Sequence, residues 1–224
     1  MNGRPGARIE IPIFPLPSTV LFPGALLPLH VFEPRYRAMT RAALEGGRRI
    51  AMALLLPGWE ADYQGAPPVH AVACAADIVA EEKLDDGRFN LLLRGFARVR
   101  IEREHPPDPF RVALCYVVED TDTAAAGGDG AGGPAPGARA REVATLMSCC
   151  RQLALRHAEL ARTLPVLEEM TAQPAALTDA LAHAFVTDPF DRQELLETFD
   201  VSRRIGRVTE ALGTLILAGA PAVN

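Results

Sequence analysis

The distribution of prolines near the start of the chain constrains the fold most, because six of them interrupt the apolar segment between Ile11 and Met39. Proline has no backbone N–H, so within a sheet it is confined to strand ends, edges and bulges. The short apolar runs between the prolines therefore predict strands of an irregular, bent sheet. The prolines are Pro12, Pro15, Pro17, Pro23, Pro28 and Pro34.

A helix is predicted to begin at Pro34, directly after these strands. Upstream, apolar residues alternate with other residues from Ile9 to Ile13, which is the period-two pattern of a half-buried strand. Proline suits the first position of a helix, and Glu33 can complement the positive end of the helix dipole. Gly46-Gly47 then predicts the end of the helix.

Further strands are expected over residues 49–56, 70–80, 88–104 and 110–118, with Asp86-Gly87 as the hairpin turn between the second and the third. Around Val99 and Ile101, charged residues at 98, 100 and 102 alternate with the apolar ones and predict one buried and one charged face. Residues 8–119 thus predict an α+β domain: a bent, mostly antiparallel sheet or partly open barrel with one helix packed against it.

Residues 120–138 differ from the rest of the chain, because alanine, glycine, proline and aspartate dominate them and no large apolar residue is present. This composition is typical of a flexible linker. Residues 139–219 predict a helical bundle, since apolar residues recur at helical spacing. One amphipathic helix is expected across 146–164, a second around Leu177 to Phe185, a third after the cap Asp188-Pro189, and a last one from Asp200.

Composition and charge exclude several classes of function. The net charge is −5, and the basic residues are dispersed rather than clustered, so binding to nucleic acid is not expected. No apolar run is long enough to span a membrane, and no signal peptide follows Met1, so a soluble cytoplasmic protein without a membrane role is expected. Four cysteines without CxxC spacing predict reduced thiols.

A resemblance to a known family rests on three separated segments that follow one another in the family's order. The first contains FPG at Phe22–Gly24, PLHVFE at Pro28–Glu33 and PRY at Pro34–Tyr36. The second contains DGRFN at 86–90 and LLRGFARV at 92–99, and the third is QELLETFDVSRR at 193–204. Together they resemble the LON domain, the N-terminal substrate-binding domain of Lon proteases, here as a stand-alone domain. The resemblance implies a PUA-like pseudobarrel that recognises polypeptide without catalysing a reaction.

Catalytic, metal and cofactor sites are not expected in this sequence. Lys83 is the only lysine and lies outside any GxxxxGK[ST] pattern, so neither a P-loop nor a serine–lysine dyad is present. The three serines lie outside GxSxG, and the five histidines show no paired ligand spacing. A hydrolase with a cysteine or carboxylate site assembled in space is the weakest hypothesis, because no nucleophile has a base at usable spacing.

Candidate peptide-binding residues lie in two places. The loop from Pro57 to Val69 carries Trp59 and Tyr63, and rigid, amphipathic aromatic rings are effective contact residues. Glu33 and Arg35, next to Phe32, form the charged pair of an otherwise apolar segment. The alternatives are that the two rings only cover the open end of the sheet, and that the charged pair only serves the helix start.

Two functional hypotheses follow from these observations. The first is a non-catalytic protein that holds unfolded or apolar polypeptide in a groove on the sheet, extended by an exposed strand edge, in the manner of an adaptor in proteolysis. The second is an interaction scaffold that docks one fixed protein partner or a second copy of itself as a homodimer.

Overall fold

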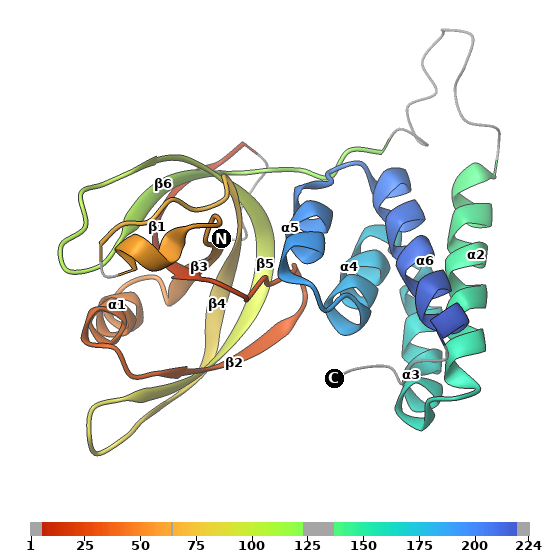
Figure 1. The fold of residues 1–224 in the computed structure, drawn as a ribbon, viewed down its shortest axis with the longest axis horizontal. Coiled ribbons are helices and arrows are strands. Elements are labelled where there is room, and N and C mark those ends of the chain that lie inside the picture. The colour runs from red at the N-terminus through yellow and green to blue at the C-terminus, as the bar shows by residue number, and fades with distance from the viewer. Residues whose placement is uncertain (1–5, 64, 123–136, 219–224) are drawn as a thin grey trace, which may run out of the picture. The chain divides into compact units, whose positions relative to one another are not determined.

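The computed structural model describes residues 6–63, 65–122 and 137–218, and the chain divides into two compact units, Met1–Glu119 and Asp120–Asn224 (Figure 1). The first unit is built from strands and the second from helices. The α+β class is thereby confirmed. Most of the expected linker, residues 123–136, lies outside the described residues. Within the described ranges, no helix is long and apolar enough to cross a membrane.

The β unit contains six strands in the order β2-β5-β4-β3-β1-β6, and β5 also pairs with β6. Five strands therefore form a closed ring of pairings, and β2 adds to β5 outside that ring. Every pairing is antiparallel except the one between β1 and β3. The strands are β1 (Arg8–Leu16), β2 (Leu26–Val31), β3 (Arg49–Leu54), β4 (Val72–Lys83), β5 (Phe89–Glu104) and β6 (Val112–Val117).

Two prolines of β1 and β2, Pro12 and Pro28, lie where the sheet tolerates them. Strand β1 changes partner along its length, since residues 8–12 pair with β6 and residues 13–16 pair with β3. Pro12 is the last residue of the first pairing, and Pro28 lies in β2, which pairs with β5 alone. The sheet is irregular, as expected, at both positions. Proline has no backbone N–H to donate, so it lies where β1 changes partner and in the edge strand β2.

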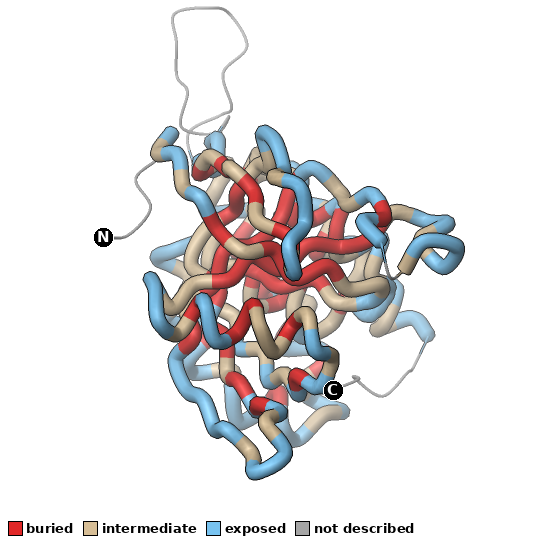
Figure 2. Tube along the Cα trace, turned by 90° about the vertical axis from the view of Figure 1, so that its left-hand side faces the viewer, coloured by how far each residue is buried: buried red, intermediate tan, exposed pale blue. Residues whose placement is uncertain are grey.

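Buried residues of the β unit gather in its central strands (Figure 2). A core cluster includes Ile11, Ile13, Val99 and Cys115, each at most 2% exposed. Helix α1 (Pro34–Glu45) has the bounds predicted from its sequence and packs against β1 and β3 with one buried face. Tyr36, Met39, Thr40 and Ala43 form that buried face.

The prediction of one charged face on β5 is wrong at Arg98, which is only 3% exposed. Strand β5 pairs with β4 on one side and with β6 on the other, and its register shifts at residues 101–103. Near this point the side of β5 that carries Arg98 is covered as well as the side that carries Val99, which is 0% exposed. Simple alternation therefore does not identify the solvent side of β5.

The second unit contains five α-helices and a short 3₁₀ helix among the described residues: α2 (Ala138–Ala154), α3 (Ala158–Glu169), η2 (Met170–Ala172), α4 (Pro174–Phe185), α5 (Pro189–Glu197) and α6 (Val201–Ala218). The expected cap at Asp188 is confirmed, since its carboxylate accepts hydrogen bonds from the backbone N–H groups of Phe190 (2.8 Å) and Asp191 (3.0 Å). Such a cap satisfies donors that the first turn of a helix leaves unpaired.

The prediction of one amphipathic helix across residues 146–164 is wrong, because the chain forms two helices there. Helix α2 ends at Ala154, and α3 begins at Ala158. His157 adopts an extended conformation (φ −131°, ψ 101°), and the N–H of Arg156 donates to the carbonyl of Leu153. Neither glycine nor proline lies at this break, so no local sequence signal distinguishes it from a continuous helix.

Candidate functional site

Three of the predicted residues form one hydrogen-bonded cluster at the start of α1. Arg35 Nε donates to Glu33 Oε2 at 3.1 Å, and the Tyr63 hydroxyl donates to Glu33 Oε1 at 2.7 Å. Arg35 Nη1 also donates to the backbone carbonyl of Tyr63 at 2.9 Å. Because both carboxylate oxygens are engaged in this way, Glu33 makes no side-chain capping bond to α1. The cluster fastens the 57–69 loop to the helix start.

Aromatic rings surround the Arg35 guanidinium. Its central carbon lies 4.6 Å from the ring centroid of Tyr36 and 4.8 Å from that of Tyr63, a geometry that favours cation–π attraction. Trp59 contacts Tyr63 edge-on, with ring centroids 5.4 Å apart, and lies in the 3₁₀ helix η1 (Trp59–Asp62). Trp59 and Tyr63 are both half-buried. Part of the surface of each ring is therefore used in contacts that hold the loop in place.

The same loop has a second anchor at Arg111, which is only 6% exposed. Its guanidinium donates to both carboxylate oxygens of Glu104, at 2.6 and 2.7 Å, and to the backbone carbonyl of Pro67 at 2.7 Å. A bidentate pair of this kind fixes orientation as well as charge. A cavity of about 220 Å³ lies between the two anchors, bordered by Arg35, Tyr36, Gly65, Ala66, Pro107, Pro109, Phe110 and Arg111.

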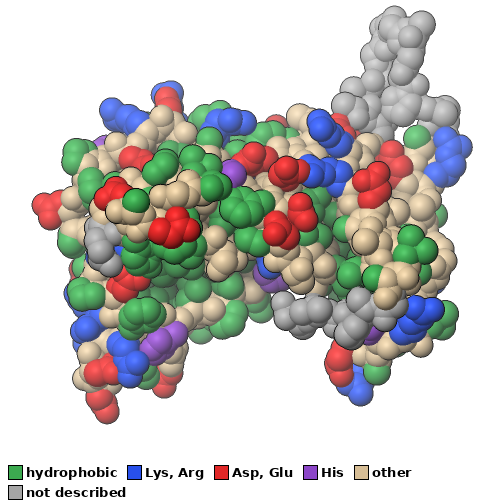
Figure 3. Space-filling view, viewed as in Figure 1, with side chains coloured by type: hydrophobic (Ala, Val, Ile, Leu, Met, Phe, Trp, Pro, Cys, Tyr) green, Lys and Arg blue, Asp and Glu red, His purple; other side chains and the backbone are tan. Residues whose placement is uncertain are grey.

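Phe32 does not join this cluster and belongs to a different surface. It is 60% exposed and stacks on the ring of His30, with centroids 6.2 Å apart. Leu26, 50% exposed, lies on the same face of β2 as His30, since residues 26 and 30 are separated by an even number of positions. Exposed hydrophobic side chains and a histidine are visible over β2 at the lower left of Figure 3.

This face continues across β5 onto β4. Pro28 pairs with Leu92 of β5, and Leu92 pairs with Ala80 of β4, next to a bulge at Val79, which is 38% exposed. Among the described residues of the β unit, Leu26, Phe32 and Val79 are the large hydrophobic side chains that stand exposed. We call this surface the β2 face: Leu26, Pro28, Phe32, Val79, Ala80 and Leu92.

Sequence reasoning identified Phe32 but missed the rest of the β2 face. Residues 26–29 are all apolar, so period-two alternation cannot show which side chains point to solvent. Pro28 predicts an edge strand, but it does not show which face of that strand meets solvent.

Three of the cysteines, Cys115, Cys149 and Cys150, lack the lowered pKa of an activated nucleophile. Burial raises the pKa of the Cys115 thiol and of the Cys150 thiol to about 12 from an ordinary value of 9.0. Burial also raises the pKa of Cys149, which is half-buried. A reactive cysteine needs the opposite shift, since the thiolate is the nucleophile. Within the described ranges no group of three or more metal-ligating side chains lies together.

Burial also raises the pKa of the Tyr36 phenol to about 12 from an ordinary value of 10.0. The fold therefore favours the neutral phenol, and this contribution to stability is complete below pH 10 and is lost as the pH rises from 10 towards 12. The buried thiols act in the same direction from pH 9 upwards.

We expect Tyr36→Phe to lose less stability than the parent chain between pH 10 and 12, measured as urea midpoints across that interval. Equal losses in both proteins would contradict the assignment.

The β unit followed by a helical unit is the architecture of solved Lon N-terminal domains. The structure matches the "N terminal domain of Mycobacterium avium complex Lon protease" with a TM-score of 0.70 and 18% identity, covering 92% of this chain and 98% of that chain. It matches the Lon N-terminal domain protein from Xanthomonas campestris with a TM-score of 0.59 and 25% identity, covering 90% and 98%.

Sequence comparison gives the same family. The model of the ATP-dependent protease La (LON) substrate-binding domain matches residues 10–214, so the chain belongs to this family. Curated relatives include the Lon protease of Desulfosudis oleivorans, 25% identical over 209 residues, and that of Escherichia coli, 26% identical over 211 residues. These alignments cover 90% and 92% of this chain but 23% and 25% of the relatives. The chain thus spans about a quarter of their length, and the likeness is confined to the substrate-binding domain.

Proposed function

We propose that this chain is a non-catalytic polypeptide-binding protein that recognises unfolded or apolar segments through the β2 face. The observation that carries the proposal is the exposure of Leu26 on β2, of Phe32 directly after β2 and of Val79 on β4, with β5 pairing to both strands. Contiguous exposed apolar side chains on a globular unit typically mark an interaction site. The family of substrate-binding domains supports a role in substrate recognition, and a role as an adaptor in proteolysis would follow from it.

The chemistry of the β2 face favours apolar clients and modest affinity that does not depend on ATP. The side chains that define the β2 face are aliphatic and aromatic, and their burial would contribute about 25 cal/mol per Å² beside the polar His30, Asn90 and Arg94 on the same side of the sheet. Pro28 removes one backbone donor from the edge strand, which weakens strand addition relative to side-chain contact. Trp59, Tyr63, Glu33 and Arg35 would then shape the neighbouring loop rather than supply most of the contact area. Four free cysteines fit a reducing setting such as the cytoplasm.

The test is binding of a permanently unfolded protein, reduced and carboxymethylated lactalbumin, measured by fluorescence anisotropy. We expect Leu26→Ser/Phe32→Ser to weaken binding at least tenfold, because truncation of central apolar contacts removes most of the binding energy of such surfaces. Both side chains are exposed, so the fold should persist. The matched control is Val166→Ser, an equally exposed apolar residue of the helical unit.

Trp59→Ala separates the two candidate surfaces. A loss of binding with Trp59→Ala alone would move the contact to the 57–69 loop and overturn the assignment to the β2 face. Parent-level binding by both variants, or no binding by the parent chain, would refute polypeptide recognition by this unit.

The scaffold hypothesis is favoured by a separate observation in the helical unit. Leu155 and Leu217 are 87% and 90% exposed, and the Arg156 side chain reaches the carbonyl of Ile216, so the ends of α2 and α6 lie close together. We propose as the second candidate that this end docks one fixed partner or a second copy of the chain. Light scattering after size exclusion would show a dimer that Leu155→Ser/Leu217→Ser dissociates, and a concentration-independent monomer would exclude the homodimer.

A further inference from the structure

The helical unit contains an apolar groove that the proposed function does not use. It has a volume of about 530 Å³ and lies between α3 and α4, next to the turn that joins α2 to α3. Its floor is formed by Leu160, Leu167 and Leu181, which are buried, and Ala184 lies on its exposed rim. A volume of this size is within the range of small-molecule sites, about 300–1,000 Å³.

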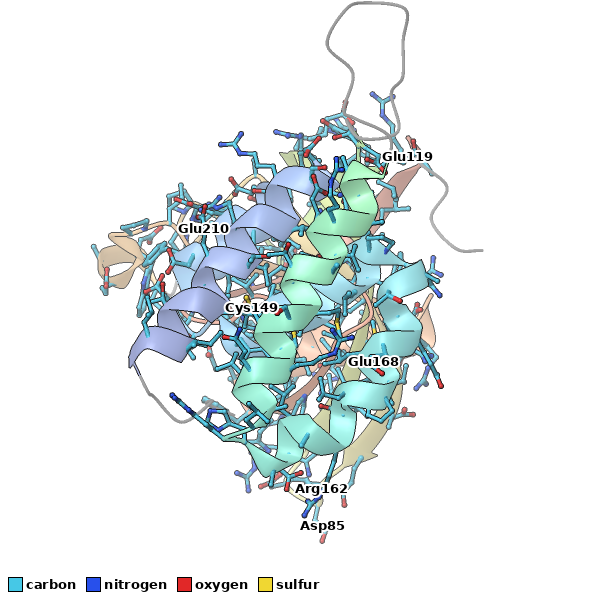
Figure 4. The ribbon with its side chains drawn as sticks, turned by 90° about the vertical axis from the view of Figure 1, so that its right-hand side faces the viewer. Asp85, Glu119, Cys149, Arg162, Glu168 and Glu210 are labelled. Carbon is cyan, nitrogen blue, oxygen red and sulfur yellow. The ribbon has the colours of Figure 1, made fainter. Side chains whose placement is uncertain are left out.

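One end of the groove carries positive charge. Arg156 lines the groove, and among the described residues its only polar contact is a long one, 3.5 Å from Nη1 to the carbonyl of Ile216. Glu159 also lines that end, and Arg162 Nη1 donates to its carboxylate at 2.5 Å, which partly offsets the negative charge. Arg162 lies near the start of α3, in the lower part of Figure 4.

The N-terminus of α3 adds to this positive end. His157 occupies the N-cap position and makes no side-chain capping bond to the backbone N–H groups of the first turn. Helix N-termini attract anions through these groups and through the helix dipole. The groove thus combines an apolar floor with a cationic end, and these two features are complementary to one kind of molecule.

We infer that the groove binds an aliphatic carboxylate, such as a free fatty acid, with the carboxylate at Arg156 and the hydrocarbon chain over Leu160, Leu167 and Leu181. This is a small-molecule site in addition to polypeptide recognition and does not depend on it. The hydrocarbon chain is long and thin enough to lie between two helices, and its burial replaces solvent over the floor.

A peptide fits the groove less well than a hydrocarbon chain. An extended peptide brings a backbone amide about every 3.3 Å, and each buried amide needs a hydrogen-bond partner. Beyond the charged end, the polar side chain of the lining is Thr163, whose hydroxyl already donates to the carbonyl of Leu160 at 3.0 Å. An aliphatic chain makes no such demand.

The first test is calorimetry of the whole chain with octanoate, decanoate and dodecanoate, below the concentrations at which these chains aggregate. We expect saturable binding of one molecule, tightening about fourfold with each buried methylene. Dodecanol should bind about tenfold more weakly, and dodecyltrimethylammonium should not bind, because the first lacks the charge and the second carries the wrong one. Binding of the cation as tight as that of the carboxylate would overturn the inference.

Two matched pairs of variants locate the site. Arg156→Gln should weaken dodecanoate about tenfold, whereas Arg203→Gln, an exposed arginine of α6 outside the lining, should not. Ala184→Trp should block the groove and abolish binding, and Ala161→Trp, an exposed alanine of α3 outside the lining, should leave it intact. All four positions are exposed, so the variants should fold. No saturable binding, or binding unchanged by Ala184→Trp, would refute the site.

Discussion

Arg204→Met is expected to destabilise the helical unit by about 3–5 kcal/mol, the usual cost of leaving a buried charge without its partner. Arg204 of α6 is fully buried, and its guanidinium binds Asp120 through two hydrogen bonds of 2.8 and 2.7 Å. Its Nε lies 3.1 Å from Asp179 Oδ1 of α4, and Nη1 donates to the carbonyl of Thr198 at 2.7 Å. One side chain thus joins Asp120 at the start of the helical unit to α4 and to the end of α5.

The cost arises because Asp179 is itself only 2% exposed. Without Arg204 its carboxylate would remain in an apolar environment or would take up a proton, and either outcome disfavours the folded state. Far-UV circular dichroism during urea unfolding should report the loss, since the helices dominate that signal.

Two further variants make the interpretation specific. Arg203→Met replaces the neighbouring exposed arginine and should change stability by no more than about 0.5 kcal/mol. Arg204→Met/Asp179→Leu should recover a large part of the loss, because replacing both members of a buried pair by apolar groups removes the uncompensated charge. A loss below 1 kcal/mol for Arg204→Met would show that the ion cluster is dispensable.

Local sequence signals predicted the elements whose ends they determine. The start of α1 at Pro34, its end before Gly46, the hairpin at Asp86-Gly87 and the cap at Asp188 all depend on residues next to the feature itself. The interruption between α2 and α3 at His157 has no such residue, and the helical periodicity of the apolar side chains continues through it. Local patterns therefore predicted one helix where tertiary packing produces two.

The site was predictable only in part for a similar reason. The sequence shows that Glu33 and Arg35 are charged residues in an apolar segment, but their partner Tyr63 is 28 residues from Arg35, so the contact depends on how the loop folds back. Arg98 and Arg204 are buried although arginines are mostly exposed in proteins, and for Arg204 the partner Asp120 is 84 residues away in the chain. The β2 face was missed because exposure of an apolar strand depends on the strand order, which no local pattern contains.

Gly95→Ala is expected to destabilise the β unit by about 3 kcal/mol, because a methyl group at this position has no space. A Cβ on Gly95 would lie 2.3 Å from the carbonyl oxygen of Phe22 and 2.9 Å from Cys74 Sγ. The first of these atoms is backbone, so no side-chain rotation relieves the clash. The turn before β2 is also held here, since Gly24 N–H donates to the Gly95 carbonyl at 2.9 Å and Gly95 N–H donates to the Ala25 carbonyl at 3.0 Å.

Moving the turn away would break these two hydrogen bonds, each worth about 1 kcal/mol. The fluorescence of Trp59, the single tryptophan of the chain, reports unfolding of the β unit. The matched control is Gly206→Ala in α6, where a Cβ meets no atom within 4 Å and where alanine should stabilise the helix by up to about 1 kcal/mol. The same substitution is therefore expected to act with opposite sign at the two positions.

The double variant Gly95→Ala/Cys74→Ala separates the two clashes. It removes the sulfur but keeps the carbonyl of Phe22, so it should rescue little of the lost stability. A full rescue would show that the clash with the sulfur alone causes the loss of stability.

Because the turn at residues 22–25 leads directly into β2, Gly95→Ala should also displace the β2 face and weaken binding of unfolded polypeptide. Gly95 would then support polypeptide binding indirectly, because its lack of a side chain lets the turn before β2 lie close to β5.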